Sequence, residues 1–439
     1  MTTFFVFILT ISIVVGIHEF GHFQMARWCN VKVLKFSIGF GKPLFTFRFG
    51  KDRTEFAISS IPLGGYVKLL DENNIETSEK VNKIDLKRAF NRQPLIKRFL
   101  IVAAGPLINI ILGILIFSFI FMHGSKQIKP SISELPVSSE AYQSGLRAGD
   151  EIASLDGSEI KSLEDLLASI KDHKEVFQDV GLKRNGEITH IKNLLWTDEI
   201  KVFPYGLPIL IQSVEAGSIA EKIGLRTHDQ MLMVDQIPIK DIPDLIASVQ
   251  KNWSQSYNLM IKRENIIQLI HIDKEVFESK VDKKRIGIAL GYDDVIIKTH
   301  LVEVKRTFEE SIKKSLVQTY AFFNLTLKTF KNLLTQKTDF KDLGGPIAIA
   351  HMASSSFVEG TFPYIQFIGL ISLNIGILNL LPIPLLDGGY LLFYLIEFVR
   401  RKPLSNKKMM ISQRVGMLIL GLLTAIALYN DACRYLLGS

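Results

Sequence analysis

The sequence contains only two cysteines, Cys29 and Cys433, among its 439 residues. They stand near opposite ends of the chain and form no CxxC pair, so neither a disulfide framework nor a cysteine-based metal site is expected. Charged side chains are missing from long stretches, the first of which covers residues 1–17. These absences argue against a small disulfide-rich secreted protein and against a wholly soluble one.

Three apolar stretches are long enough to cross a membrane, whose hydrocarbon core takes about 20 apolar residues in a helix. A fourth, residues 415–429, is short for a span, but apolar residues on either side could extend it. A cleaved signal peptide is the alternative explanation of the first stretch. It fits poorly, because the stretch has no basic region at its start and no clear small-residue cleavage site. The predicted spans are residues 1–28, 99–122, 362–399 and 409–437.

The third apolar stretch is much longer than one span requires and is interrupted by Pro382, Pro384 and Asp387-Gly388-Gly389. Proline breaks the hydrogen-bond ladder of a helix, so one spanning helix that unwinds or kinks is expected here. An unpaired carboxylate inside an apolar segment is costly and usually functional. Asp387 is therefore a candidate site residue.

The net charge is +8, and its distribution indicates a membrane surface and no nucleic-acid partner. Lys and Arg concentrate between Arg27 and Arg98 and again between Arg400 and Lys408, beside apolar stretches. This is the positive-inside pattern, which places both clusters on the cytoplasmic side. Both chain termini and the long region between spans two and three are then predicted to lie outside.

Residues 18–22 read His-Glu-Phe-Gly-His inside the first predicted span. On a helix this spacing puts two imidazoles one turn apart on the same face, as a zinc ion requires. A catalytic zinc takes three protein ligands, and Asp387 is the candidate third because coordination of a dication offsets the cost of burying it. Glu19 is the candidate general base. The motif also occurs by chance in soluble helices, but a partner Asp in another span disfavours that explanation.

The region between spans two and three contains an internal duplication, in which residues 139–170 match residues 218–249 without a gap. Each copy is long enough to be a small domain, and we predict domains over residues 127–200 and 201–292. The pattern of a Gly-Leu turn, an Asp, an apolar strand and an amphipathic helix resembles PDZ domains, which bind peptides by strand addition. Residues 207–211 predict an opening strand in the second copy, and the first copy has no equally clear one. The copies could instead be spacers or steric filters.

Residues 300–345 alternate charged and apolar positions at helical spacing and predict amphipathic peripheral helices. They could lie on the outer leaflet, where lysines suit a lipid surface, or pack on the spans. A solvated helix face is the simpler alternative for any one lysine. The apolar stripe consists of Phe308, Ile312, Leu316, Tyr320 and Phe323.

Taken together, the motifs of the chain resemble those of the site-2 protease family of intramembrane zinc metalloproteases, and most closely its bacterial regulator of sigma-E protease branch. The resemblance covers essentially the whole chain. The motifs that carry it lie at residues 18–22, 36–41, 64–68, 104–109, 344–347 and 379–389.

The resemblance implies an α-helical polytopic membrane protein with four transmembrane helices, a membrane-dipping β-hairpin within residues 29–98, and two tandem PDZ-like α+β domains outside the membrane. It implies that His18, His22 and Asp387 bind Zn2+ and that Glu19 is catalytic. Asn379 would help to hold the substrate backbone beside the metal.

The family resemblance also implies that the hairpin pairs with an unwound substrate, through a segment that contains Gly64, Gly65, Tyr66, Val67 and Lys68. A transmembrane helix hides its peptide carbonyls in hydrogen bonds and must be opened before hydrolysis. Strand addition at a β edge would hold it open. An ordinary soluble hairpin is the alternative.

The implied function is intramembrane proteolysis in the bacterial inner membrane. Substrates would be transmembrane segments of single-span proteins, such as an anti-sigma factor already trimmed outside, and remnant signal peptides. Two other classes compete with this prediction. A non-catalytic PDZ-like scaffold is disfavoured by the intact Glu19, and a transporter would show inverted repeats among its spans, which the sequence lacks.

Overall fold

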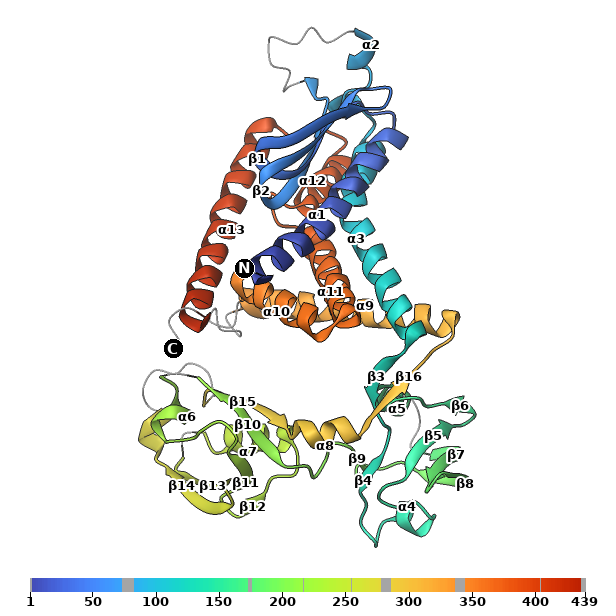
Figure 1. Ribbon diagram of the computed structural model, residues 1–439, viewed down its shortest axis with the longest axis vertical. Helices are drawn as coiled ribbons and strands as arrows, with labels where there is room; N and C mark the ends of the chain where they lie inside the picture. The colour runs from blue at the N-terminus through green and yellow to red at the C-terminus, as the bar shows by residue number, and fades with distance from the viewer. Residues whose placement is uncertain are drawn as a thin grey trace. The chain divides into compact units, whose positions relative to one another are not determined.

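The computed structural model describes residues 2–72, 83–172, 176–215, 217–253, 255–277, 286–335, 344–402 and 404–435. The chain divides into two compact units (Figure 1). The membrane unit comprises residues 1–123 and 306–438, and the repeat unit comprises residues 124–305.

The membrane unit is mainly helical and carries one small β-sheet. Its elements are α1 (Thr2–Trp28), β1 (Val33–Phe49), β2 (Thr54–Leu69), α2 (Lys83–Leu86), η2 (Phe90–Arg92), α3 (Leu95–His123), α9 (Phe308–Leu334), α10 (Pro346–Glu359), α11 (Thr361–Leu380), α12 (Asp387–Arg400) and α13 (Asn406–Tyr435).

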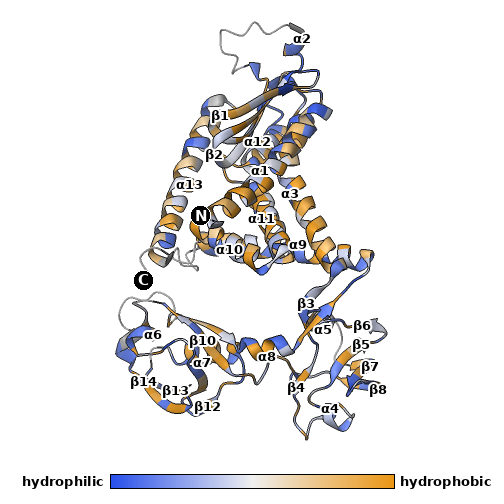
Figure 2. Ribbon diagram, in the orientation of Figure 1, coloured by the Kyte–Doolittle hydropathy of each residue, from blue (hydrophilic) through white to orange (hydrophobic). Residues whose placement is uncertain are grey.

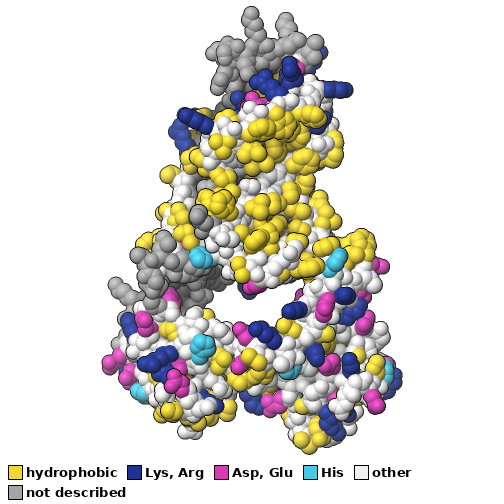
Figure 3. Space-filling view, in the orientation of Figure 1, with side chains coloured by type: hydrophobic (Ala, Val, Ile, Leu, Met, Phe, Trp, Pro, Cys, Tyr) yellow, Lys and Arg dark blue, Asp and Glu magenta, His cyan; other side chains and the backbone are white. Residues whose placement is uncertain are grey.

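Four helices among the described residues are long and apolar enough to cross a membrane, which confirms the predicted number of spans. They are α1, α3, α11 and residues 407–433 of α13. Figure 2 shows apolar residues along these helices, and Figure 3 shows a broad apolar surface across the middle of the unit. Lipid contact explains this surface, because a soluble protein would not leave so many large apolar side chains uncovered.

The predicted broken helix over residues 362–399 consists of two helices in the structure. α11 is long enough to span by itself, and residues 381–386 separate it from α12. Pro382 and Pro384 lack the N–H groups that a continuous helix needs. Leu385 lies in the left-handed region at φ 85°, a strained conformation for a branched side chain, and completes the break.

Small residues let the spanning helices approach closely. A Cβ on Gly21 of α1 would strike the Ala104 carbonyl of α3, and one on Gly376 of α11 would come 2.8 Å from the Pro106 carbonyl. The Ser372 hydroxyl donates to the Asn109 carbonyl at 2.8 Å. Membrane helices associate by this kind of close packing, because lipid offers no hydrophobic driving force between them.

The Asp431 carboxylate connects α13 to the start of α10. It is fully buried and accepts backbone N–H groups from Gly345, Ile347 and Ala348 at 2.8–3.1 Å. A helix start leaves its first N–H groups unsatisfied, and here a side chain from a distant helix replaces the usual cap.

The predicted amphipathic segment contains one long helix, α9, although residues 336–343 lie outside the described part. Ser311 and Ser315 are buried, and Ser118 on α3 donates to Ser315 at 3.0 Å. Phe308, Leu316, Tyr320 and Phe323 of the predicted apolar stripe are instead exposed. The helix therefore packs on the span through small polar residues and leaves most of that stripe uncovered.

The strands β1 and β2 are each long enough to fold back on themselves, so they form an antiparallel sheet with four runs of chain. Residues 33–38 lie in the middle and pair on one side with residues 55–58 and on the other with residues 65–69. Residues 43–49 pair with residues 54–59. The run that ends at Leu69 is thus an edge of the sheet within the described part of the chain.

The repeat unit contains short strands and helices. Its elements are β3 (Ser125–Ile128), β4 (Ile132–Glu134), α4 (Glu140–Gln143), β5 (Glu151–Leu155), β6 (Ser158–Glu159), α5 (Leu163–Asp172), β7 (Val176–Arg184), β8 (Glu187–Leu195), β9 (Lys201–Val202), β10 (Ile209–Val214), α6 (Ile219–Lys222), β11 (Gln230–Val234), β12 (Ile237–Pro238), α7 (Ile242–Lys251), β13 (Tyr257–Arg263), β14 (Ile266–Ile272), η3 (Lys274–Phe277), β15 (Ile288–Tyr292), α8 (Asp294–Thr299) and β16 (Leu301–Val304).

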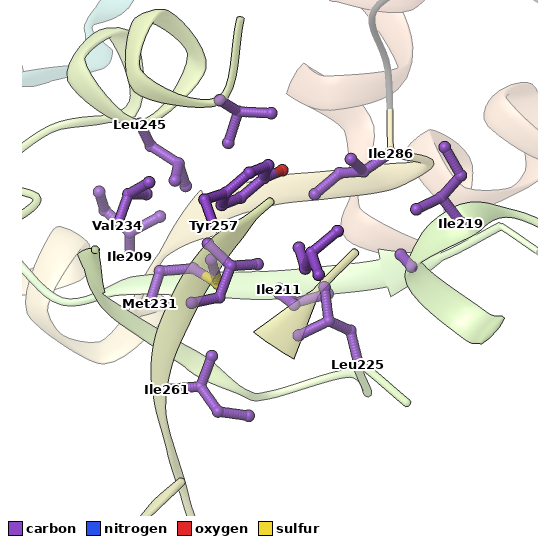
Figure 4. Close-up of a cluster of buried hydrophobic side chains, with 14 residues drawn as sticks. Ile209, Ile211, Ile219, Leu225, Met231, Val234, Leu245, Tyr257, Ile261 and Ile286 are labelled. Carbon is purple, nitrogen blue, oxygen red and sulfur yellow. The ribbon is translucent and has the colours of Figure 1, made fainter. Parts of the chain in front are cut away.

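The two copies of the duplication share their local structure from α4 to β8 and from α6 to β14. Ser139 and Ser218 each accept a backbone N–H at the start of the first helix. The match extends beyond the residues that the sequence comparison covered, because β5 pairs with β7 as β11 pairs with β13. Each copy has its own buried apolar core, and Figure 4 shows the core of the second around Tyr257.

The first copy also has the opening strand that the sequence did not show clearly. Ile132 in β4 donates to the Asp150 carbonyl at 2.8 Å, and Ile211 in β10 donates to the Asp229 carbonyl at 2.9 Å. The two strands are equivalent but differ in extent. β4 pairs with β9, whereas β10 pairs with β11 and β15 in a longer sheet.

Candidate metal centre

The two histidines of the sequence motif lie one turn apart on α1 and face the interior of the membrane unit. Their Nε2 atoms are 3.3 Å apart, and their side chains are 10% and 13% exposed. α1 contains no acidic residue in its first turn and is apolar from its start to Ile17. His18 and His22 lie in the interior of the membrane unit because they follow this long uncharged run of the same helix.

Asp387 reaches the histidines because α12 begins at that residue. Its Oδ2 lies 3.1 Å from His18 Nε2 and 3.4 Å from His22 Nε2. The next two glycines are required by close packing: a Cβ on Gly388 would strike the Leu381 carbonyl, and one on Gly389 would lie 2.5 Å from the Ile383 carbonyl. The break between α11 and α12 therefore aims the carboxylate at the histidine pair.

The three side chains fit a zinc ion. They form a group of His and Asp ligands that could hold a metal, and their ligand atoms lie 3.1–3.4 Å from one another. Ligand atoms at about 2.0–2.1 Å from a tetrahedral zinc are separated by about 3.3 Å, so the spacing matches. Asp387 Oδ2 is buried and makes no hydrogen bond of good geometry among the described residues; its polar neighbours are the two Nε2 atoms, and a cation between the three atoms would satisfy all of them.

Neighbouring groups of α3 orient the imidazoles. His22 Nδ1 lies 2.9 Å from the Ile101 carbonyl and donates to it, which leaves Nε2 free to bind a metal. The Asn109 amide faces His18 Nδ1 at 3.5 Å, and its buried Oδ1 has no hydrogen-bond partner in the described part of the chain. Amide oxygen and nitrogen positions are interchangeable by a 180° rotation, after which Oδ1 accepts from His18 Nδ1–H.

Glu19 lies beside the edge run of the β-sheet. A Cβ on Gly65 would come 2.9 Å from Glu19 Cγ and 2.8 Å from the Ser37 carbonyl, so only glycine fits between them. Gly64 has φ 159° and is packed against the Phe40 ring. The sequence predicted a functional role for residues 64–68, and the structure brings the start of this segment to the carboxylate.

The other predicted substrate-binding residues are placed as follows. Tyr66, Val67 and Lys68 continue the edge run and pair with Ser37, Phe36 and Lys35. Asn379 is half-buried on the last turn of α11, before the break that leads to Asp387. No hydrogen bond of its side chain is found among the described residues.

Sequence reasoning missed the supporting groups on α3. Gly105 and Asn109 belong to the motif at residues 104–109, but the sequence alone predicted no role for either residue. A Cβ on Gly105 would strike the Nε2 atom of His22 directly. The available signal was Asn109 itself, a polar residue inside an apolar span, where it is costly without a partner.

An HExxH helix with a carboxylate beside its two histidines, among apolar helices, is the arrangement expected of a membrane zinc metalloprotease. The model of Peptidase family M50 matches residues 6–423, so the chain belongs to this family.

Relatives match over nearly their whole length. A Neisseria meningitidis chain, named as a zinc metalloprotease, is 33% identical over 99% of this chain and 100% of its own. Protease RseP of Yersinia pestis is 32% identical, with 98% of both chains covered. The regulator of sigma-E protease RseP of Salmonella typhimurium is also 32% identical over 98% of both chains.

Proposed function

We propose that this metalloprotease hydrolyses peptide bonds within the transmembrane segments of single-span proteins. The observation that carries the proposal is the position of His18, His22 and Asp387 on helices of the membrane unit. When bound there, zinc polarises a peptide carbonyl and acidifies water. Glu19, one residue from a ligand, takes the proton from the attacking water and delivers it to the leaving amine.

The edge run of the β-sheet would hold the substrate open. Residues 64–68 begin beside Glu19 and have a free β edge within the described part of the structure. An extended peptide added to that edge exposes its carbonyls to the site, whereas a transmembrane helix hides them. Asn379 lies at the end of α11, and its side chain would also hold the substrate backbone.

Two relatives named as RseP proteases indicate the substrate class. An anti-sigma factor in the sigma-E envelope stress response would be cut within its transmembrane segment after another protease trims its outer part. Remnant signal peptides are a second class. The protein would reside in the bacterial inner membrane, with both termini and the repeat unit on the periplasmic side and the metal site toward the cytoplasm.

The two copies of the repeat unit would be PDZ-like domains over residues 127–200 and 201–292. In the second copy β10 is paired on both sides, with β11 and β15, so a bound peptide would have to pair with an outer strand of this sheet, such as β15. Both copies would also exclude substrates that still carry a bulky outer domain. The membrane unit would comprise spans at residues 1–28, 99–122 and 409–437 and a third, broken span at 362–399, with the hairpin in 29–98 and peripheral helices in 300–345.

Replacement of Glu19 by Gln tests the proposed chemistry. The Glu19→Gln variant should retain one zinc per chain, since no ligand changes, but should not cleave a single-span substrate reconstituted with it in vesicles. The control is Glu359→Gln, an exposed residue at the end of α10, which should cleave like the wild type. Normal cleavage by the Glu19→Gln variant would remove Glu19 from the mechanism.

A further inference from the structure

A second candidate binding site lies in the membrane unit, where the first turn of α3 meets the last turn of α12. The Arg98 guanidinium on α3 pairs with the Glu397 carboxylate on α12 at 2.6 Å and lies over the Tyr394 ring. This ion pair fixes the two helix ends side by side. It also neutralises Glu397, the acidic residue of the junction.

A pocket of about 530 Å³ opens at this junction. Its apolar wall includes Leu95, Phe398 and Val399, and its basic rim is formed by Arg401 and Lys402. Phe398 is 70% exposed and Val399 is 75% exposed, although both adjoin the end of a helix. In a membrane protein, large apolar side chains that no protein atoms cover are typically in contact with lipid.

The rim carries uncompensated positive charge. Arg401 and Lys402 are exposed and take part in no ion pair among the described residues. Of the other basic groups near the pocket, Arg98 pairs with Glu397 and Lys97 donates to the Cys29 carbonyl at 3.2 Å, whereas Arg400 at the end of α12 is exposed and forms no ion pair among the described residues. Two free cations beside an apolar wall match an amphiphile with an anionic head.

The backbone at Arg401 gives an independent indication. α12 ends at Arg400, and Arg401 occupies the cap position in the left-handed conformation at φ 53° and ψ 23°. Glycine or asparagine usually takes this position, because a larger residue is strained there. A strained residue at an exposed helix end suggests that its side chain is needed.

We propose that this junction binds the phosphate head of an anionic phospholipid, with an acyl chain along Leu95, Phe398 and Val399. α3 begins its span at Leu95, so the pocket lies at the boundary between the hydrocarbon core and water. Basic pockets between transmembrane helices at such a boundary suit anionic lipid heads. The site is separate from the zinc ligands and does not depend on the proposed proteolysis.

Native mass spectrometry of the detergent-purified full-length protein tests the site, with phosphatidylglycerol and phosphatidylcholine as probes. The wild type should bind phosphatidylglycerol at about one per chain and clearly more tightly than phosphatidylcholine. The Arg401→Gln/Lys402→Gln variant should bind phosphatidylglycerol about 30-fold more weakly, or five- to sixfold for each charge removed.

The matched control is Lys407→Gln/Lys408→Gln, which removes the same charge at the start of α13, away from the pocket lining. It should bind phosphatidylglycerol like the wild type. Soluble glycerol phosphate at millimolar concentration should not displace the lipid, since it lacks an acyl chain. Equal losses in both double variants, equal binding of the two lipids, or full displacement by glycerol phosphate would each overturn the proposal. Zinc content verifies that every variant is folded.

Discussion

At the scale of the residue, the metal site depends on the absence of side-chain atoms as much as on ligands. Gly105 lies against the His22 ligand atom, Gly65 lies against Glu19, and Gly388 allows Asp387 to begin its helix. Each glycine lets one backbone segment approach a functional group at a distance that any Cβ would prevent. The site is therefore assembled by close backbone packing from four segments of the chain.

Gly105→Ala should reduce the affinity for zinc at least tenfold, because the new methyl group displaces the His22 imidazole from its ligand position. Metal analysis after dialysis against a competing chelator measures this loss. Gly421→Ala on α13 is the control, since a Cβ there meets nothing within 4 Å. Alanine also has the higher helix propensity, so this control should keep its zinc and its stability. Equal zinc retention by the two variants would contradict the role of Gly105.

The grouping of the candidate ligands could be predicted from the sequence, but the groups that support them could not. His18 and His22 have a spacing that only a helix converts into proximity, and Asp387 was an anomalous charge in an apolar segment. Nothing local in the sequence links Asn109 to His18 or Gly105 to His22, because both contacts depend on how α1 packs against α3. Long-range packing of this kind leaves no periodic signal in one sequence.

At the scale of the element, the two copies of the repeat share an ion pair between a buried aspartate and a partly exposed arginine. The Asp150 carboxylate accepts from Arg184 at the end of β7, and the Asp229 carboxylate accepts from Arg263 at the end of β13. Both arginines also donate to the carbonyl of the preceding Gly-Leu turn. The aspartates were found by the sequence comparison, whereas their arginine partners lay beyond the matched segment.

The pair in the second copy predicts a pH dependence of stability. Burial opposes the charged form of Asp229, but the Arg263 guanidinium and the Arg226 N–H outweigh it, so the pKa of Asp229 lies below its ordinary value. A depressed folded-state pKa contributes stability above about pH 4, and this contribution is lost as the pH falls through the folded-state pKa.

Asp229→Asn should therefore lower the free energy of unfolding of this copy by about 3 kcal/mol at pH 7, because it leaves Arg263 without its counter-charge. The loss should shrink as the pH falls below 4. Hydrogen exchange of β13 and β14 in the full-length protein measures both effects. The control Asp241→Asn should change little, since asparagine also caps a helix. A loss that stays constant down to pH 2 would contradict the ion-pair explanation.

The third span illustrates the limit of element prediction. Pro382 and Pro384 correctly indicated an interruption, but the sequence did not show whether the helix kinks or ends. The outcome depends on Gly388, Gly389 and Gly416, which pack against carbonyls of the connecting segment and allow it to fold between α11 and α13. These are tertiary contacts that local propensity does not encode.

At the scale of the whole molecule, the proposed function assigns chemistry to one unit and substrate selection to the other. The three candidate metal ligands and Glu19 belong to the membrane unit, whereas the duplicated domains belong to the repeat unit. Peptide hydrolysis in a membrane requires control, because any single-span protein offers the same kind of bond. In the proposed function, the repeat unit supplies that control by excluding bulky outer domains.

A series of substrates with one transmembrane segment and different outer parts tests this control. The full-length protein should cleave a substrate with a short outer segment at least tenfold faster than one with a folded outer domain. An unfolded outer segment of the same length as the folded domain is the control for length, and it should be cleaved at an intermediate or fast rate. Equal initial rates for all three substrates would eliminate the steric role.

The central claim is that one zinc ion is held jointly by α1 and α12. Metal analysis of the purified full-length wild type and of the Asp387→Ala variant tests it most directly. The wild type should contain one zinc per chain, and the variant, left with two imidazoles, should lose most of its zinc on dialysis together with all cleavage. An Asp387→Ala protein that retains one zinc per chain would contradict the account, because it would exclude Asp387 from the ligand set.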